Sequence, residues 1–536
     1  MPPPTDSQHA GAAPRAAAVR WSALEWGGLA LCALLGVLNL WNPFTYDQAL
    51  FAMGGEHVLN GGLLYRDFWD TKQPGIFWFF ALGLRLFGPS EEGVHLLELL
   101  WFTGFAAVLM VTLRRAFDHR WGSVAAALLV VGFYWATTRD WHQTQPEGLA
   151  QFPLFVAMWF AIEAVRSERG AFSRWVLAGF AGGIVGVFKL LLVGLPALFW
   201  LALIGARLAD SRPGRVRDVA LAIAGLSLGF AIPMGAMLAA LASQGLLPDA
   251  WYTWVVFPKW VTAQIHGLPL KAWEQTFHWF FAAWSPLLAF AVVGAWTGLR
   301  GRQAAFIRLL VLWIVAGFPL LLAQKFSGWE YHLMLFLVPL GLLAARGMDA
   351  LARPLAGLRP PGAARELRAL LLVAVLAVFA PTVVAAAVKA AELAKDRFVT
   401  TPAMRARHML RVSQGGGYYR FTEEGEFLRQ PGARPGPIFV IGNPLVQWLS
   451  GRRSSLPRNG DILFEYHTAQ EWADAARRLE ATRTPYVFVE APKLEQLETF
   501  RPRSDALLAV LASRYRVMRE SRYGTWFEWS DSAATR

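Results

Sequence analysis

Long apolar runs, divided by short loops that carry arginine, fill most of this sequence. A bilayer core needs about 20 helical residues to cross it, and by that rule we predict about eleven membrane spans. They lie near residues 22–41, 93–113, 121–137, 148–165, 173–188, 190–206, 218–242, 280–299, 305–323, 332–349 and 368–389. The predicted fold class is therefore a polytopic α-helical membrane protein.

The composition agrees with this fold class. Of the 536 residues, 55% are hydrophobic and 17% are charged, whereas a soluble domain usually carries about 25% charged residues. The 25 tryptophans suit the membrane–water interface, where an apolar ring with one N–H donor is favoured. The single cysteine, Cys32, excludes a disulfide framework and a cysteine metal cluster.

The net charge of +13 indicates topology rather than a nucleic-acid partner. Loops rich in Lys and Arg stay in the cytoplasm. With a disordered cytoplasmic tail at residues 1–20, every second loop carries an arginine cluster, and we predict a multi-pass protein of the cytoplasmic membrane. The clusters are Arg114, Arg115 and Arg120; Arg166, Arg169 and Arg174; Arg207, Arg212, Arg215 and Arg217; Arg300, Arg302 and Arg308; and Arg346, Arg353, Arg359, Arg365 and Arg368.

One apolar run does not fit the series of spans. Residues 75–88 are apolar but number only fourteen. If they crossed the membrane, every later arginine cluster would lie outside. We therefore predict a re-entrant or interfacial helix inside a long, structured first outer loop at 42–92.

The composition changes near residue 390, where apolar runs shorten and charged residues become frequent. Alternating strand and helix patterns there predict a small α/β domain. The predicted strands are 437–442, 486–490 and 523–529, and the predicted helices are 469–481 and 505–515. We thus divide the chain into a tail at 1–20, a transmembrane module at 21–389 and an α/β domain at 390–536. With the N-terminus in the cytoplasm, an odd number of spans places that domain on the outer side of the membrane.

Ionisable residues gather on the predicted outer face, and Asp47 is the first of them. It follows the first span closely, where a carboxylate can orient an acceptor hydroxyl, remove its proton or hold a divalent cation. The alternative is a helix N-cap, a role that Asp fills well. Lys72 can neutralise a phosphate as a point charge or extend to the interface as a structural lysine.

Three later outer segments add further candidates. The loop at 137–152 carries Asp140, His142 and Glu147, and a lone acid at the mouth of a span is expensive unless it is used. Lys189 interrupts two apolar helices, as a functional lysine or one that reaches to the interface. The segment 324–340 brings Lys325, Glu330, Tyr331 and His332.

Motifs of soluble enzymes are missing from the sequence. It has no P-loop, no dinucleotide-binding glycine motif in a strand–helix context, no HExxH and no GxSxG. Without a nucleotide cradle, an enzyme acting at the outer face needs an activated substrate that is itself in the membrane. Clear metal-ligand spacing is also missing, so a divalent cation is possible but no cofactor is specified.

Six segments, in order along the chain, resemble the GT-C membrane glycosyltransferases. They resemble most the bacterial branch related to protein O-mannosyltransferases and lipid A aminoarabinose transferases. The segments are YDQALF, DTKQPGIFWFFALGLRLFG, TQPEGLAQF, GFAGGIVGVFKLLL, YHLMLFLVPL and IFVIGNPLVQWLSGRRSS. Two departures stand out: Gln48 occupies the place of a family Glu, and Gln73 that of the first Pro of a KPP turn.

The resemblance implies an enzyme that takes a sugar from a polyprenyl phosphate in the outer leaflet and inverts the anomeric centre. The acceptor would be a lipid, a glycan or a protein, and the helix at 75–88 would border the prenyl tail. Asp47 would be the base or orienting carboxylate, with Glu147 or Asp140 as a second acid. The donor phosphate would be bound by Lys72, Lys189, Lys325, Tyr331 and His332. The substrate groove would include Tyr46, Gln48, Arg66, Asp70, His142 and Glu330.

Two other function classes remain open from the sequence. A transporter or lipid flippase would carry polar groups near mid-span and some pseudo-symmetry between its halves. A non-catalytic membrane anchor would only display the 390–536 domain, and it would not need ordered polar loops earlier in the chain.

Overall fold

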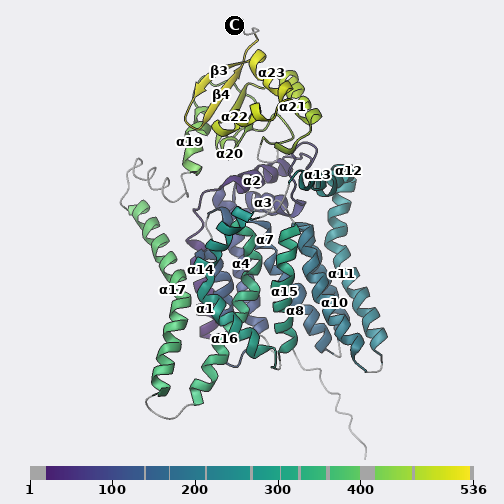
Figure 1. Ribbon diagram of the computed structural model, residues 1–536, viewed down its shortest axis with the longest axis vertical. Coiled ribbons are helices and arrows are strands. Elements are labelled where there is room, and N and C mark those ends of the chain that lie inside the picture. Colours follow the sequence, from purple (N-terminus) through teal and green to yellow (C-terminus); the bar gives the residue numbers. More distant parts are fainter. Residues whose placement is uncertain are drawn as a thin grey trace, which may run out of the picture.

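The protein is described here from a computed structural model. It describes residues 20–137, 140–167, 170–211, 214–265, 270–301, 303–323, 328–357, 363–398, 417–460 and 465–531. A bundle of helices carries a smaller unit with a β-sheet at one end (Figure 1). We call the end of the bundle under that unit the domain-side end.

The bundle is that of a multi-span membrane protein. Within the described ranges, eight helices are long and apolar enough to cross a membrane, or nine if the bent helix α14 (Leu270–Gly298) is included. The eight spans are Glu91–Leu113, Pro146–Arg166, Ala171–Phe188, Leu190–Ala209, Arg215–Ser243, Ala304–Ala323, Glu330–Ala352 and Arg365–Lys395. They correspond to α4 (Glu91–Leu113), α7–α8 (Pro146–Leu149, Gln151–Arg166), α9 (Ala171–Phe188), η3–α10 (Leu190–Val193, Gly194–Ala209), α11 (Arg215–Ser243), α15 (Ala304–Ala323), η5–α16 (Glu330–Phe336, Leu337–Gly357) and α17 (Ala363–Phe398).

Two of the predicted spans form shorter apolar helices. The run at 22–41 becomes α1 (Ala23–Val37), and the run at 121–137 becomes α5, η1 and α6 (Trp121–Ala127, Leu128–Gly132, Phe133–Thr137). Both fall below the roughly 20 residues that a straight span needs. The total of about eleven spans therefore stays a prediction.

The first loop forms two helices at the domain-side end, α2 (Tyr46–Leu59) and α3 (Pro74–Phe87). They lie together beneath the sheet-bearing unit (Figure 1). Pro74 starts α3, where a missing N–H and a fixed φ suit the first helical position. A Cβ at Gly75 would lie 2.5 Å from the carbonyl oxygen of Val187, so glycine lets α3 contact the end of α9.

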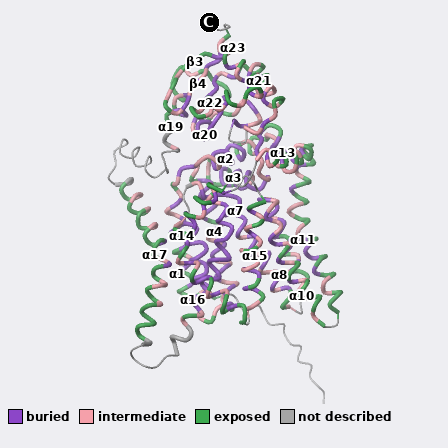
Figure 2. Tube along the Cα trace, in the orientation of Figure 1, coloured by how far each residue is buried: buried purple, intermediate pink, exposed green. Residues whose placement is uncertain are grey.

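Burial separates the centre of the bundle from its edge (Figure 2). In the apolar stretch of Glu330–Ala352, 89% of residues are buried, against 11% in Arg365–Lys395. α17 exposes Leu370, Val373 and Leu376, and in a bilayer such a surface faces lipid. The span that begins at Glu330 is therefore central, and α17 is peripheral.

The C-terminal unit contains a four-stranded sheet with the order β1-β2-β4-β3. β1 and β2 are parallel, and the pairs β2–β4 and β3–β4 are antiparallel. The strands are β1 (Ile438–Ile441), β2 (Tyr486–Glu490), β3 (Tyr515–Glu520) and β4 (Gly524–Trp529). The helices are α19 (Gly417–Phe427), α20 (Leu445–Ser450), α21 (Ala469–Thr482), α22 (Ala491–Thr499) and α23 (Asp505–Arg514).

The structure confirms the predicted elements of this unit and adds others. The three predicted strands appear as β1, β2 and β4, and the two predicted helices as α21 and α23. The edge strand β3 was missed because its middle residues are exposed and a register shift between Val517 and Arg519 breaks the alternation.

Several hydrogen bonds and ring contacts join the sheet-bearing unit to the bundle and to the first loop. Trp448 Nε1 donates a hydrogen bond to Glu91 Oε1 at 3.0 Å, which ties α20 to the start of α4. The Trp69 amide donates to the Pro457 carbonyl at 2.8 Å, and the Arg458 guanidinium lies 4.5 Å from the centre of the Trp69 ring. The first loop is thus held between the bundle and the C-terminal unit.

Candidate active site

The start of α2 presents Asp47 without using it as a cap. Thr45 is the N-cap, and Gln48 closes a capping box by accepting from the Thr45 amide at 2.7 Å. Gln48 Nε2 also donates to the Gln143 carbonyl at 3.0 Å, and its side chain is buried. The N-cap alternative for Asp47 is therefore wrong, because Asp47 occupies the second helical position.

The carboxylate of Asp47 lies among polar groups from other segments. Gln145 Nε2 donates to Asp47 Oδ2 at 3.2 Å, and the Tyr331 side chain forms a second hydrogen bond with Asp47. Burial raises the pKa of Asp47 above its ordinary value, and the charges of Asp70 and Glu147 add to this effect. The nearby ammonium of Lys72 acts in the opposite direction.

Lys72 is fixed through its backbone. The Tyr65 hydroxyl donates to the Lys72 carbonyl at 2.8 Å, and the Lys72 amide donates to Asp70 Oδ1 at 2.8 Å. The Lys72 ammonium lies 5.6 Å from the centre of the Phe51 ring on α2. The loop therefore places one partly buried positive charge near Asp47, and Asp70, which is 2% exposed, supports this turn.

Glu147, Lys189 and His332 form a second polar group, and each of them lies at the end of a different span. Glu147 stands in the first turn of α7 and is 1% exposed. Lys189 Nζ donates to Glu147 Oε1, and His332 Nε2 lies 3.4 Å from the same oxygen. Lys189 separates α9 from η3 in an extended conformation, which turns its side chain into the bundle. A buried carboxylate is stable only with such partners.

Tyr331 and His332 enter the site from η5, the short helix that precedes α16. Their rings are 4.5 Å apart, centre to centre. In the residue before them, Glu330 Oε2 lies 3.1 Å from His142 Nε2. His142 is fully buried, and its ring packs 4.7 Å from that of Trp279. The pair of His142 and Glu330 thus joins two segments beside the site.

The remaining predicted residues lie apart from this cluster or outside the described structure. Arg66 is exposed and pairs with Asp249 at 2.7 Å, at the edge of the domain-side end. Tyr46 is partly buried at the start of α2. The side chain of Asp140, and all of Lys325, lie outside the described residues.

Sequence reasoning missed a buried network next to the site. Glu98 and His95 on α4, Tyr134 on α6 and Thr144 are all buried and linked by hydrogen bonds. A Glu and a His three residues apart inside an apolar span were the available signal, because ionisable side chains are costly in a bilayer.

Metal binding finds no ready site in the described part of the chain, where no group of three or more His, Cys, Asp and Glu side chains could hold an ion.

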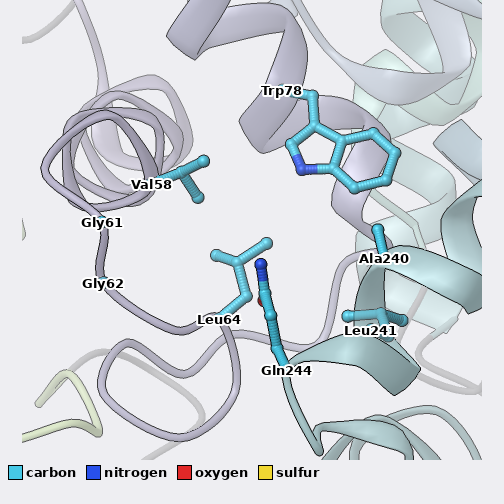
Figure 3. Close-up of a pocket in the computed structure, with 8 residues that line it drawn as sticks. All are labelled: Val58, Gly61, Gly62, Leu64, Trp78, Ala240, Leu241 and Gln244. Atoms are coloured by element: carbon cyan, nitrogen blue, oxygen red, sulfur yellow. The ribbon is translucent and has the colours of Figure 1, made fainter.

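A cavity of about 90 Å³ lies between α2, α3 and α11 (Figure 3). Val58, Leu64, Trp78 and Leu241 give it apolar walls, and the amide of Gln244 projects among them beside Leu64. Its lining does not include the charged residues of the site.

Comparison with known sequences points to transferases. Residues 71–232 match the family described as dolichyl-phosphate-mannose-protein mannosyltransferase. A relative from Pseudomonas fluorescens, undecaprenyl phosphate-alpha-4-amino-4-deoxy-L-arabinose arabinosyl transferase 1, is 27% identical over 336 residues. That match covers 59% of this chain and 57% of the relative, so the chain spans little more than half the length of this curated relative.

Comparison with solved structures decides the fold. The crystal structure of ArnT from Cupriavidus metallidurans bound to undecaprenyl phosphate matches with a TM-score of 0.63. The match covers 96% of this chain and 100% of that chain at 15% identity. The chain has the GT-C fold. The resemblance that the six segments indicated is thereby confirmed for the fold, while residue roles rest on the geometry described above.

Proposed function

We propose that this chain is a membrane glycosyltransferase that moves a sugar from a polyprenyl-phosphate donor to a lipid, glycan or protein acceptor. One observation carries the proposal: Asp47, a partly buried carboxylate, lies beside the ammonium of Lys72 at the domain-side end of a GT-C fold. The solved ArnT with this fold holds undecaprenyl phosphate, and the Pseudomonas fluorescens relative is named for a sugar on the same carrier.

The chemistry is one displacement at the anomeric carbon. The acceptor oxygen forms a bond to that carbon while the bond from the carbon to the phosphate oxygen breaks. The bonding electron pair leaves with the phosphate, and Asp47 takes the proton of the acceptor hydroxyl. The raised pKa of Asp47 suits this role, because a base works best when its pKa approaches the working pH.

The two lysines have different tasks in this proposal. Lys72 stabilises the leaving phosphate as a point charge, and one well-placed charge of this kind contributes on the order of 10²–10³ in rate. Lys189 is 10% exposed and already pairs with Glu147. Its task is to hold Glu147 and His332 in place. Its charge acts on the phosphate only at a distance, because Glu147 lies between them in this proposal.

A single carboxylate performs the base step. Gln48 stands where related enzymes have a second acid, and its amide groups are used in the capping box and the bond to Gln143. Glu147 is close enough for its charge to raise the pKa of Asp47, but its Oε1 faces Lys189 and His332. It therefore tunes Asp47 rather than replacing it.

The site faces the periplasmic or extracellular side of the cytoplasmic membrane. The arginine clusters support a cytoplasmic N-terminus and an external C-terminal unit. An external site can receive its lipid donor directly from the outer leaflet. The apolar cavity beside Trp78 supports a path for the prenyl tail along α3.

The decisive experiment is sugar transfer by the purified chain in liposomes. A panel of radiolabelled polyprenyl-phosphate sugars is supplied with a crude membrane extract as acceptor, with and without EDTA, beside Asp47→Asn. Transfer from one donor that vanishes in the variant supports the proposal and names the sugar, and the EDTA lane tests the divalent cation. Absence of transfer from every donor would favour a transporter or a membrane anchor.

A further inference from the structure

The segment that carries Gln145 and Glu147 is held in a conformation that it would not adopt alone. Thr144 has φ +54°, in the left-handed region. A β-branched side chain there is a steric outlier and persists only when its surroundings hold it. The two residues that follow it closely make the contacts of the site: Gln145 donates to Asp47, and Glu147 accepts from Lys189.

The group that holds Thr144 is the buried carboxylate of Glu98. The Thr144 amide donates to Glu98 Oε1 at 2.7 Å, and the Thr144 hydroxyl donates to Glu98 Oε2 at 3.1 Å. The Tyr134 hydroxyl donates to Oε1, and His95 Nδ1 lies 3.2 Å from Oε2. These four partners use the four lone-pair sites of a carboxylate, and Glu98 has no exposed surface.

We propose that Glu98 is a positioning residue that fixes the left-handed turn at Thr144 and so places Gln145 against Asp47 and Glu147 against Lys189. The proposal deepens the proposed function and rests on it. Glu98 lies on α4, a span that contributes no other residue to the site. It acts through the backbone of the turn and does not touch the substrate.

The hydrogen bonds predict which substitution Glu98 tolerates. His95 Nε2 lies 3.1 Å from the Asn42 carbonyl, which can only accept, so this nitrogen carries a proton. Nδ1 also donates in the wild type, because the Glu98 carboxylate can only accept, whereas opposite the amide nitrogen of Glu98→Gln the ring can be neutral and Nδ1 can accept. The amide of Glu98→Gln can accept from Tyr134 and from the Thr144 amide with its oxygen. It can donate to His95 Nδ1 and to the Thr144 hydroxyl with its nitrogen. Gln therefore preserves the geometry without the charge, and Leu preserves neither.

The test compares wild type, Glu98→Gln and Glu98→Leu in the full-length protein, with Glu163→Gln as the matched control. Glu163 is an acid on α8 that is partly exposed and pairs with Arg166. Hydrogen–deuterium exchange of the peptide that contains Thr144 measures the turn, and transfer kinetics separate kcat from KM. Exchange is informative even if no donor is ever transferred, so failure of this inference and failure of the proposed function are distinguishable.

We expect slow exchange and nearly wild-type kcat for Glu98→Gln and for the control. For Glu98→Leu we expect fast exchange and a kcat lower by on the order of 10², the effect of displacing reacting groups by about 1 Å, with a smaller change in KM. If Glu98→Leu does not fold, Tyr134→Phe removes one donor to Glu98 and should show the same changes more weakly. Unchanged exchange in both Glu98→Leu and Tyr134→Phe would overturn the proposal. A loss of kcat in Glu98→Gln with wild-type exchange would also overturn it.

Discussion

The site has two halves that treat their carboxylates in opposite ways. The loop half consists of Asp47, Asp70 and Lys72. The span half consists of Glu147, Lys189 and His332. Asp47 is partly buried and accepts from two neutral groups, on Gln145 and Tyr331, whereas Glu147 is buried against two basic side chains. The difference separates a carboxylate available for proton transfer from one whose charge is neutralised within the protein.

The largest expected effect comes from Asp47→Asn. Loss of the base should lower kcat by about 10²–10⁴-fold, measured with the radiolabelled donor. Because a carboxyl with a raised pKa costs folding stability above its unfolded pKa, we expect the Tm at pH 7 to stay unchanged or rise. Asp67→Asn changes an exposed acid of the same loop and should leave the rate unchanged. Unfolding of Asp47→Asn would contradict the assigned role.

Glu147→Gln should break the span half and mainly affect stability. The substitution leaves the buried cation of Lys189 without its counter-charge, and removing one partner of a buried pair costs about 3–5 kcal/mol. We therefore expect a clear fall in Tm in detergent, together with lower transfer. Glu163→Gln, which removes a partly exposed acid from the following helix, should change Tm little. Equal Tm values for the two variants would remove the distinction between the halves.

The pH dependence of transfer should report the loop half. Only ionised Asp47 can take a proton, so kcat should rise with pH, with a midpoint above the ordinary carboxyl range near 4. At lower pH the carboxyl is protonated and the rate is lost. Transfer assays across a pH series check this limb, and Asp70→Asn should move it toward lower pH because a like charge is removed. If the midpoint of the rise in kcat is the same in Asp70→Asn as in the wild type, the result would argue against this placement of the charges.

The smallest effect is expected from Arg458→Ala, which loosens the loop half from a distance. The Arg458 guanidinium packs on Trp69 and pairs with Glu471 at 2.7 Å. Such a cation–π contact contributes about 0.5–2 kcal/mol, so we expect KM for the donor to rise severalfold while Glu147 and its partners stay intact. Arg477→Ala, on the exposed face of α21, is the control. A larger loss of transfer activity in Arg458→Ala than in Glu147→Gln would mean that the C-terminal unit takes part in the reaction.

Much of the fold was predictable because a membrane span requires a long apolar run, which is visible in the local sequence. Apolar length identified the eight long spans of the described residues, while α3 is one of three shorter apolar helices there, and its exclusion from the spans stays a prediction. The strands β1, β2 and β4 followed from apolar patterning. β3 was missed because an exposed edge strand carries no clear apolar alternation.

The candidate site was predictable as a set of residues but not as an arrangement. Asp47, Lys72, Glu147, Lys189 and His332 were selected because charge near a membrane is expensive unless it is used. Their pairing was not visible, since Glu147 and Lys189 are separated by a full span and its return. The same distance hid Glu98, whose partners come from α6 and the turn at Thr144.

The sequence by itself determined that the chain enters a membrane, which runs form helices and which residue types line one face, because each follows from local hydrophobicity and charge. Only the tertiary structure decided that Lys189 neutralises Glu147 while Asp47 keeps neutral hydrogen-bond partners. Electrostatic interactions between side chains depend on distance and burial in space, and those are set only when the spans pack together.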